Sequence, residues 1–221
     1  MDARYARNVL LDGLGVNGQQ RLCKATVLVI GIGGVGCATA VELAGLGVNL
    51  VLCDNDKVEK TNLNRQFLFN EEDIGSSKVA AARKALHRFN PRIKIGVATD
   101  FKKLDFRKFD VVVDCTDAYE TRMAVSRECE RKKVPLIYAS AVGYVARVAL
   151  FKKRYLHRMA SGGREGGNAC ETAGVFPPAS AVAGSIAASE TVKQILNDEK
   201  TIEGKMFVID LEKDKMKILK I

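Results

Sequence analysis

The sequence predicts an α/β protein with a doubly wound, mainly parallel β-sheet that antiparallel strands continue in its C-terminal half. Two observations lead to this fold class. Between residues 26 and 139, short apolar runs alternate with helical segments, as in sheets whose parallel strands are joined by crossover helices. Beyond residue 140, a strand pattern at 144–151 follows the preceding strand without room for a crossover helix, which indicates an antiparallel neighbour.

The expected strands are short apolar runs, many of them bounded by Gly, Pro, Asn or Asp. The first, Thr26 to Ile30, is almost wholly apolar, which is typical of a strand buried on both faces. In chain order, the expected strands lie at residues 26–30, 49–53, 93–98, 110–114, 135–139, 144–151, 206–211 and 216–219.

The expected helices lie at residues 4–11, 17–24, 35–46, 77–89, 119–132 and 179–196. Gly47 closes the helix at 35–46, and either Asp73 or Ser76 is able to cap the helix at 77–89. Residues 152–169 are rich in Lys, Arg and Gly, a composition that favours a mobile surface loop. A loop of this length in a compact domain is often functional.

The amino-acid composition limits the number of domains and the classes of partner that we expect. A chain of 221 residues, 47% of them hydrophobic, suits one well-buried domain. The formal charge of +9 permits an acidic partner or a phosphate-rich ligand, but the basic residues are scattered, so we expect no nucleic-acid partner. No apolar stretch resembles a signal peptide or a membrane span, so we expect a cytoplasmic protein with reduced thiols and no membrane partner. Three of the six cysteines lie in apolar runs and are expected to be buried: Cys37, Cys53 and Cys115.

A glycine-rich motif follows the first expected strand. Gly31, Gly33 and Gly36 satisfy G-x-G-x-x-G between a strand and a helix, where backbone N–H groups and the helix dipole can meet a phosphate. Asp54 ends the next strand, where a carboxylate can bind ribose hydroxyls. The motif predicts a nucleotide site at the carboxyl ends of the strands.

Polar residues beyond the second strand narrow the choice of nucleotide. Asn62, Arg65 and Lys78 supply an amide and two cations, which suit the three anionic groups of a triphosphate. Two carboxylates close the fourth strand. Asp117 is placed to hold Mg²⁺ against the phosphates, whereas Asp114 is expected either to join the site or to cap the next helix or bind backbone.

Several segments follow one another over nearly the whole chain: Arg4-Tyr5-Ala6-Arg7, GIGGVG, LCDNDKVEKTNLNRQFLF, DIGSSKVAAARKAL, FNP, DCTD, CETAGVFPP and GSIAASETVKQI. In this order and spacing, the chain resembles the ThiF/MoeB/HesA adenylyltransferases, relatives of the ubiquitin-activating enzymes. The resemblance implies one Rossmann-like adenylating domain. Its parts are a helical segment at 1–25, a nucleotide-binding half at 26–140 and an antiparallel half at 141–221 with a crossover loop at 152–178.

The implied reaction is the activation, by ATP and Mg²⁺, of the C-terminal glycine carboxylate of a small acidic ubiquitin-like carrier that ends in Gly-Gly and is similar to ThiS or MoaD. The carboxylate attacks the α-phosphate, pyrophosphate leaves and an acyl-adenylate forms. The resemblance also implies a homodimer with two shared sites and a sulfur donor such as a cysteine desulfurase. Thiamine, molybdopterin and thiolated-tRNA biosynthesis are the implied pathways.

The resemblance assigns roles to individual residues. Asn62, Arg65 and Lys78 are implied to contact the phosphates, Asp117 the Mg²⁺, and Arg7 the site of the partner subunit. Cys170 is a candidate to take the carrier as a thioester or acyl-persulfide, and a plain structural role for it stays open. The expected nucleotide-binding residues are Gly33, Gly34, Gly36, Asp54, Asp56, Thr61, Asn62, Arg65 and Lys78.

The chain departs from the family pattern in three respects. It lacks the two C-x-x-C pairs that hold a structural zinc in many relatives, so we expect no zinc. Ala118 stands where relatives often have Asn, so one nucleotide contact is in doubt. We expect no C-terminal rhodanese-like domain, so sulfur is expected to come from another protein. The terminal strands and the exposed sheet face are candidates for the groove that takes the carrier's tail.

Three alternatives stay open. A relative in the same superfamily adenylates another substrate, such as a peptide or a tRNA. A non-catalytic nucleotide-binding scaffold is disfavoured because the chain retains the residues of the expected site. A nicotinamide oxidoreductase ranks lower, since His87 falls on a helix face and His157 in the loop, and no hydride-transfer pair is evident.

Overall fold

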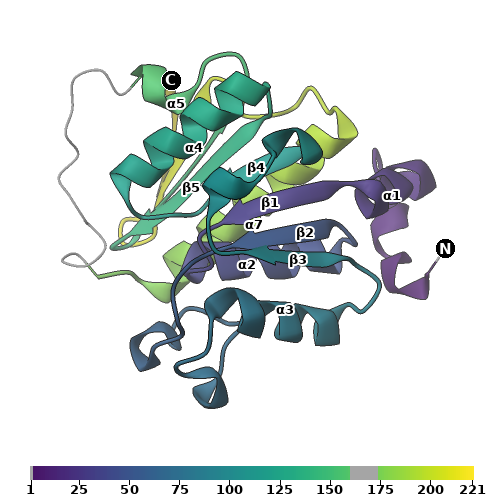
Figure 1. Ribbon diagram of the computed structural model, residues 1–221. Coiled ribbons are helices and arrows are strands. Elements are labelled where there is room, and N and C mark those ends of the chain that lie inside the picture. The colour runs from purple at the N-terminus through teal and green to yellow at the C-terminus, as the bar shows by residue number, and fades with distance from the viewer. Residues whose placement is uncertain (1, 160–173) are drawn as a thin grey trace.

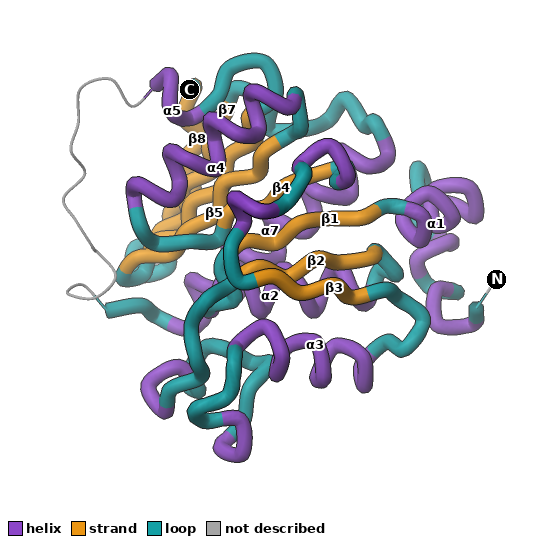
Figure 2. The backbone as a smooth tube through the Cα atoms, viewed as in Figure 1, coloured by secondary structure: helices purple, strands orange, loops and turns teal. Residues whose placement is uncertain are grey.

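The computed structural model describes residues 2–159 and 174–221. In this part of the chain, an eight-stranded sheet has the order β3-β2-β1-β4-β5-β6-β7-β8, with helices packed on both of its faces (Figures 1 and 2). The strands are β1 Thr26–Ile30, β2 Asn49–Cys53, β3 Ile95–Ala98, β4 Val111–Asp114, β5 Leu136–Val142, β6 Val145–Phe151, β7 Lys205–Asp210 and β8 Lys215–Lys220. The α-helices are α1 Gly15–Lys24, α2 Gly34–Gly45, α3 Lys78–Phe89, α4 Tyr119–Lys132, α5 Leu156–Met159 and α7 Pro177–Leu196.

The sheet confirms the expected fold class. Strands β3, β2, β1, β4 and β5 pair in parallel, and β6, β7 and β8 continue the sheet antiparallel. The chain leaves β1 for β2 and β3 on one side and then crosses to β4 on the other side. Ligands of doubly wound sheets bind at the carboxyl ends of the strands at such a reversal, which here lies between β1 and β4.

Two hydrophobic cores flank the sheet. The alternating residues of β1 divide between them, because successive side chains of a strand point to opposite faces. Val27 and Val29 join the core under α2, α3 and α7, whereas Leu28 and Ile30 join the core under α4 and α5. The sheet is therefore covered on both sides, as the continuous apolar strands predict.

Short 3₁₀ turns replace longer helices in several connections. They are η1 Ala3–Tyr5, η2 Asn8–Leu10, η3 Lys60–Asn62, η4 Glu71–Asp73, η5 Phe101–Lys103 and η6 Phe106–Lys108. The first two stand where the sequence predicted a helix at 4–11. The crossover from β3 to β4 holds only η5 and η6, which pack Phe106 against the sheet. None of the described helices is long and apolar enough to cross a bilayer.

The prediction of a loop at 152–169 is wrong for residues 156–159, which form α5, and its part at 160–169 lies outside the described residues. Tyr155 is buried and its hydroxyl donates to Val134 O at 3.0 Å, which holds this segment against the sheet. His157 lies in α5 and not in a loop. Its Nδ1 is 3.0 Å from Ser126 Oγ and its Nε2 is 3.1 Å from Glu130 Oε2. The expected crossover loop at 152–178 also ends early, since α7 begins at Pro177.

The expected cap of the third helix is also wrong. Ser77 is the N-cap of α3 and makes no side-chain cap hydrogen bond. Asp73 instead accepts a hydrogen bond from Asn70 N at 3.0 Å and so closes η4. Ser76 uses its backbone carbonyl to accept from Val58 N at 2.9 Å. A local turn bond therefore takes the carboxylate of Asp73 that the sequence assigned to the helix end.

Candidate functional site

The glycine motif forms a tight turn at the carboxyl end of β1. Gly31 has φ +86°, and a Cβ atom there would lie 2.9 Å from Cys115 O in the turn after β4. A Cβ atom at Gly36 would lie 1.9 Å from Gly31 O. Both positions require glycine for close backbone approach. The turn therefore brings the N-terminus of α2 against the β4–α4 connection, with its first-turn N–H groups at the strand ends.

Gly34 is where three distant segments meet. A Cβ atom there would lie 2.9 Å from Ser180 Oγ and 3.3 Å from Arg65 Cγ. Ser180 is buried in the first turn of α7, so the start of α7 closes one side of the site. The sequence prediction included Gly34 and Arg65 but missed Ser180, because a lone serine in a helix of small residues carries no motif.

Asp54 ties the glycine turn to the end of β2. Its Oδ2 accepts a hydrogen bond from Ile32 N at 2.6 Å, and its Oδ1 accepts one from Asp56 N at 2.8 Å. The residue is half-buried. A carboxylate oxygen accepts more than one hydrogen bond, so the carboxylate retains capacity to bind a ribose hydroxyl, as the sequence predicts.

Lys78 reaches the same edge of the sheet from the first turn of α3. Its Nζ lies 2.8 Å from Asp56 Oδ2, and its backbone N donates to Asp56 O at 3.0 Å. The lysine side chain is 9% exposed, against 61% for the aspartate. The structure therefore brings together two predicted site residues, with the ammonium group buried and oriented.

The run from Thr61 to Gln66 lies beside the glycine turn. Asn62 is buried, and its Oδ1 accepts from Glu59 N at 3.1 Å, so it shapes η3. Arg65 is half-buried and its Nη1 donates to Thr61 O at 2.9 Å. The hydroxyl of Thr61, at the exposed rim, donates to Glu59 Oε2 at 3.3 Å. Arg65 thus approaches Gly34 through its Cγ, and its guanidinium is fixed by the turn that carries it.

Gln66 is a site residue that the sequence prediction did not assign. Its side chain is buried, and its Oε1 has no hydrogen-bond partner among the residues that the structure describes. Its Nε2 would lie 4.0 Å from a Cβ atom at Gly33. A buried amide oxygen without a partner is costly, and its position beside the glycine turn suits a ligand that donates a hydrogen bond. The only signal in the sequence is its place directly after Arg65.

The turn after β4 separates the two carboxylates. Asp114 is fully buried, and its Oδ1 accepts from Thr116 N at 2.9 Å and from Thr116 Oγ1 at 2.7 Å. Of the alternatives for Asp114, backbone binding is therefore correct; Ala118 is the N-cap of α4. Asp114 Oδ2 also lies 3.7 Å from Arg122 Nη1. Asp117 is exposed at the same edge of the sheet.

The acidic groups at this edge fit a magnesium ion only with help from a ligand. The described residues hold no cluster of three or more His, Cys, Asp or Glu able to bind a metal. Mg²⁺ is commonly held by one or two carboxylates together with phosphate oxygens and water. Asp117 supplies one exposed carboxylate, which fits this arrangement, and its magnesium role stays a prediction.

Arg7 does not lie with the other predicted residues. It is exposed at the start of η2, in a segment that packs against the C-terminal ends of α2 and α3. Asn90 Nδ2 donates there to Tyr5 Oη at 3.0 Å and to Ala44 O at 2.7 Å. Helices in a doubly wound fold run opposite to their strands, so this is the edge away from the carboxyl ends of β1, β2 and β4 (Figure 1).

Four of the five cysteines that the structure describes have a raised pKa, and Cys23 is exposed. Burial raises the pKa of Cys37, Cys53 and Cys115 to about 12 in each case. Cys37 and Cys53 are buried as expected, and Cys115 is half-buried. Burial also raises the pKa of Cys129. The predicted acceptor Cys170 lies outside the described residues.

The chain is similar to known proteins both in sequence and in fold. The sequence model of the ThiF family matches residues 5–221. The sulfur carrier protein ThiS adenylyltransferase of Escherichia coli is 36% identical over 217 residues, which cover 94% of this chain and 86% of that protein. The molybdopterin-synthase adenylyltransferase of Haemophilus influenzae is 36% identical over 224 residues, covering 95% of this chain and 90% of that protein.

Among solved structures, the crystal structure of E. coli MccB with ATP is similar over 99% of this chain and 72% of that chain, with a TM-score of 0.84 and 26% identity. The structure of MccB with MccA-N7isoASN has a TM-score of 0.85 and 26% identity, covering 100% of this chain and 72% of that one. The matched part includes every strand of the sheet described above.

Proposed function

Because the chain belongs to the ThiF family and is an ATP-binding adenylyltransferase, we propose that it activates the C-terminal glycine carboxylate of a small ubiquitin-like sulfur carrier. A carboxylate oxygen of the carrier attacks the α-phosphorus of ATP. The bond from that phosphorus to the bridging oxygen breaks, pyrophosphate leaves with the electron pair, and an acyl-adenylate forms. Two relatives that this chain matches over most of their length are named for ThiS and molybdopterin synthase, which supports a carrier of this type.

The observation that carries the proposal is the meeting of Gly34, Arg65 and Ser180 at the N-terminus of α2. A phosphate at this position receives backbone N–H groups of α2, the positive end of its dipole and the guanidinium of Arg65. Asn62 supports the turn that places Arg65. The site therefore holds the triphosphate rigidly and lets the carboxylate approach in line, which is the main contribution of protein groups to such a reaction.

Lys78 is proposed to balance the charge that develops as pyrophosphate leaves. Its ammonium group is buried and already held by Asp56, so little reorganisation is needed at the moment of reaction. Asp117 is proposed to hold Mg²⁺ together with phosphate oxygens. Bound Mg²⁺ would withdraw negative charge from the phosphates.

Arg7 is proposed to act in the site of a second subunit. The carboxyl ends of the strands in the same subunit lie at the opposite edge of the sheet (Figure 1). Within one chain, Arg7 therefore does not reach the nucleotide. An isologous homodimer would place the same arginine at both shared sites. Cys170 and an external sulfur donor of the cysteine desulfurase type belong to the step after adenylation.

The test is pyrophosphate exchange into ATP with a panel of purified carriers, each in a full-length form and a form without its final glycine. We expect exchange only with a full-length carrier. Exchange that is equal with the truncated carriers would contradict carboxylate activation at that residue. The pathway follows from which carrier, thiamine-type or molybdopterin-type, supports the reaction at the lowest concentration.

A peptide substrate is the second candidate. It is favoured by the structural similarity to MccB in complex with MccA-N7isoASN. The same exchange assay with a short peptide in place of the carrier separates the two functions, because each acceptor stimulates exchange only in an enzyme that activates it.

A further inference from the structure

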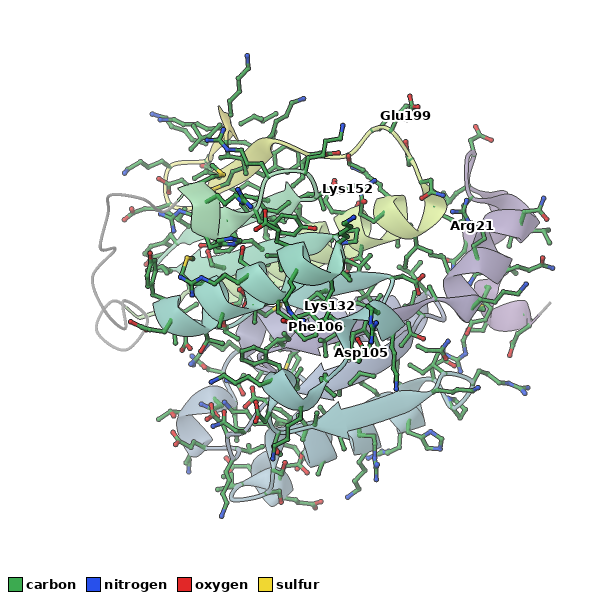
Figure 3. The ribbon with its side chains drawn as sticks, turned by 45° about the horizontal axis from the view of Figure 1, so that its top comes forward. Arg21, Asp105, Phe106, Lys132, Lys152 and Glu199 are labelled. Carbon is green, nitrogen blue, oxygen red and sulfur yellow. The ribbon has the colours of Figure 1, made fainter. Side chains whose placement is uncertain are left out.

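A groove of about 440 Å³ lies between α4 and the β3–β4 crossover, on the face of the sheet opposite α2. None of its lining residues belongs to the candidate nucleotide site. In Figure 3, the labelled Asp105, Phe106 and Lys132 lie together in this region. The residues that line the groove are Phe101, Lys102, Lys103, Leu104, Asp105, Arg107, Ala124, Glu128, Arg131 and Lys132.

The groove exists because this crossover contains no α-helix. Residues 99–110 form only the turns η5 and η6, where a regular doubly wound fold lays a helix beside α4. The turns are anchored by Phe106, which is fully buried and packs its ring 6.4 Å from those of Phe101 and Phe109. The groove beside α4 is therefore a fixed part of the fold.

The walls of the groove are cationic. They carry five Lys and Arg side chains against two carboxylates, an excess of three positive charges. Asp105 Oδ2 lies 2.9 Å from Arg107 Nη2, and this ion pair lowers the pKa of Asp105 to about 2. Glu128 forms a second fork with Arg131, at 2.6 and 2.8 Å. Within each of these two pairs, the charges of the carboxylate and the arginine cancel.

Three lysines supply the excess charge. Lys102 and Lys103 end η5, and Lys132 ends α4. Among the residues that the structure describes, none of the three has an ion-pair partner within 4.0 Å. The floor between them is apolar and half-buried, formed by Phe101, Leu104 and Ala124. The groove thus combines an apolar floor with unneutralised ammonium groups along its rim.

We propose that this groove docks an acidic, amphipathic segment of a partner protein, with its apolar side chains on the Phe101–Leu104 floor and its carboxylates on Lys102, Lys103 and Lys132. A nucleic-acid backbone fits less well, because a row of phosphates offers no apolar groups to the Phe101–Leu104 floor. The chain's net charge of +9 steers acidic proteins towards it.

Fluorescence anisotropy with labelled probes tests this docking site without ATP or carrier, so its result is independent of the proposed adenylation. The probes are a short Glu/Leu peptide, a Glu/Gly peptide of the same length and charge, and a uridine oligonucleotide of the same charge. The groove variant is Lys102→Glu/Lys103→Glu/Lys132→Glu. The matched control reverses three exposed charges on α3, in Arg83→Glu/Lys84→Glu/Arg88→Glu.

The expected result is tightest binding of the Glu/Leu peptide and a loss of about tenfold or more in the groove variant, with the α3 control within about twofold of the wild type. Equal loss in both variants, tighter binding of the oligonucleotide, equal affinity for both peptides, or no peptide binding by the wild type would each overturn the proposal. Thermal melting checks that the variants fold. If the groove variant does not fold, the milder Lys102→Gln/Lys103→Gln/Lys132→Gln variant replaces it.

Discussion

Lys78 and Asp56 form an ion pair at the carboxyl edge of the sheet, with Lys78 Nζ 2.8 Å from Asp56 Oδ2. The pair joins an almost buried cation to a carboxylate that reaches solvent. Backbone atoms of the same two residues are also hydrogen-bonded, Lys78 N to Asp56 O at 3.0 Å. The end of β2 therefore sets both the start of α3 and the direction of its lysine.

Variants of this pair distinguish charge compensation by Lys78 from the positioning of Lys78 by Asp56. We expect Lys78→Ala to lower kcat for carrier-dependent pyrophosphate exchange by about 100-fold or more, because a preorganised positive charge is lost. Asp56→Asn keeps the lysine but loosens it, so its main effect is expected on the KM for ATP. Exchange close to wild type in Lys78→Ala would rule out the assigned role of the lysine.

Gly34 tests the meeting point of the three segments. A methyl group there would lie 3.0 Å from Ser180 Cβ and 2.9 Å from its Oγ, so Gly34→Ala is expected to displace the start of α7 and weaken ATP binding. Adding Ser180→Gly removes the clashing atoms and should restore part of the affinity, measured by isothermal titration with ATP. If the double variant binds no better than Gly34→Ala, the contact with Ser180 is not the cause.

Asp117 tests the magnesium assignment. Asp117→Ala is expected to abolish carrier-dependent exchange and to leave the thermal midpoint almost unchanged, because the side chain is exposed. Glu120→Ala, which removes a nearby exposed carboxylate in the first turn of α4, is the matched control and should retain activity. Unchanged pyrophosphate exchange in Asp117→Ala would contradict the assignment of Mg²⁺ binding to Asp117.

Arg7 tests the shared site through subunit mixing. Arg7→Ala and Lys78→Ala homodimers should each be nearly inactive. A mixed dimer contains one site with both residues intact, so mixing and re-equilibrating the two inactive variants is expected to restore part of the wild-type exchange rate. No recovery in dimers shown to have exchanged subunits would argue that Arg7 does not act across the interface.

The cysteines are expected to differ in their reactivity towards an alkylating reagent. Burial holds the pKa of Cys37, Cys53 and Cys115 near 12, so at pH 8 iodoacetamide should leave them unmodified and label the exposed Cys23. Mass spectrometry of the digested protein reads the pattern. Rapid labelling of Cys37, Cys53 or Cys115 would contradict the packing described above.

Cys170 carries a separate prediction for the later step. Cys170→Ala is expected to leave pyrophosphate exchange largely intact and to block sulfur transfer to the carrier, because adenylation needs no protein nucleophile. Sulfur transfer at the wild-type rate would show that the thiol is dispensable.

Much of the fold was predictable because its signals are local. The β1 and β2 strands and helix α4 fall at the expected residues, since continuous apolar runs and helical periodicity report on neighbours in the sequence. The errors lie where tertiary packing overrides composition. Tyr155 anchors α5 in a segment whose Lys and Arg residues suggested a loop.

The candidate site was predictable to the extent that its residues form motifs. Gly34, Asp54 and Lys78 do so and meet at one edge of the sheet. Ser180 and Gln66 do not, because one is distant in sequence from every other member and the other is recognisable only by its burial.

From the sequence alone came the positions of most strands along the chain, the glycine turn and the cationic residues beyond β2, because each depends on residue types at short spacing. The tertiary structure decided which of these residues share a site. It placed Arg7 at the opposite edge, brought Ser180 against Gly34, and opened a lysine-rimmed groove beside α4. Such juxtapositions depend on how distant segments pack, and local propensities do not encode that.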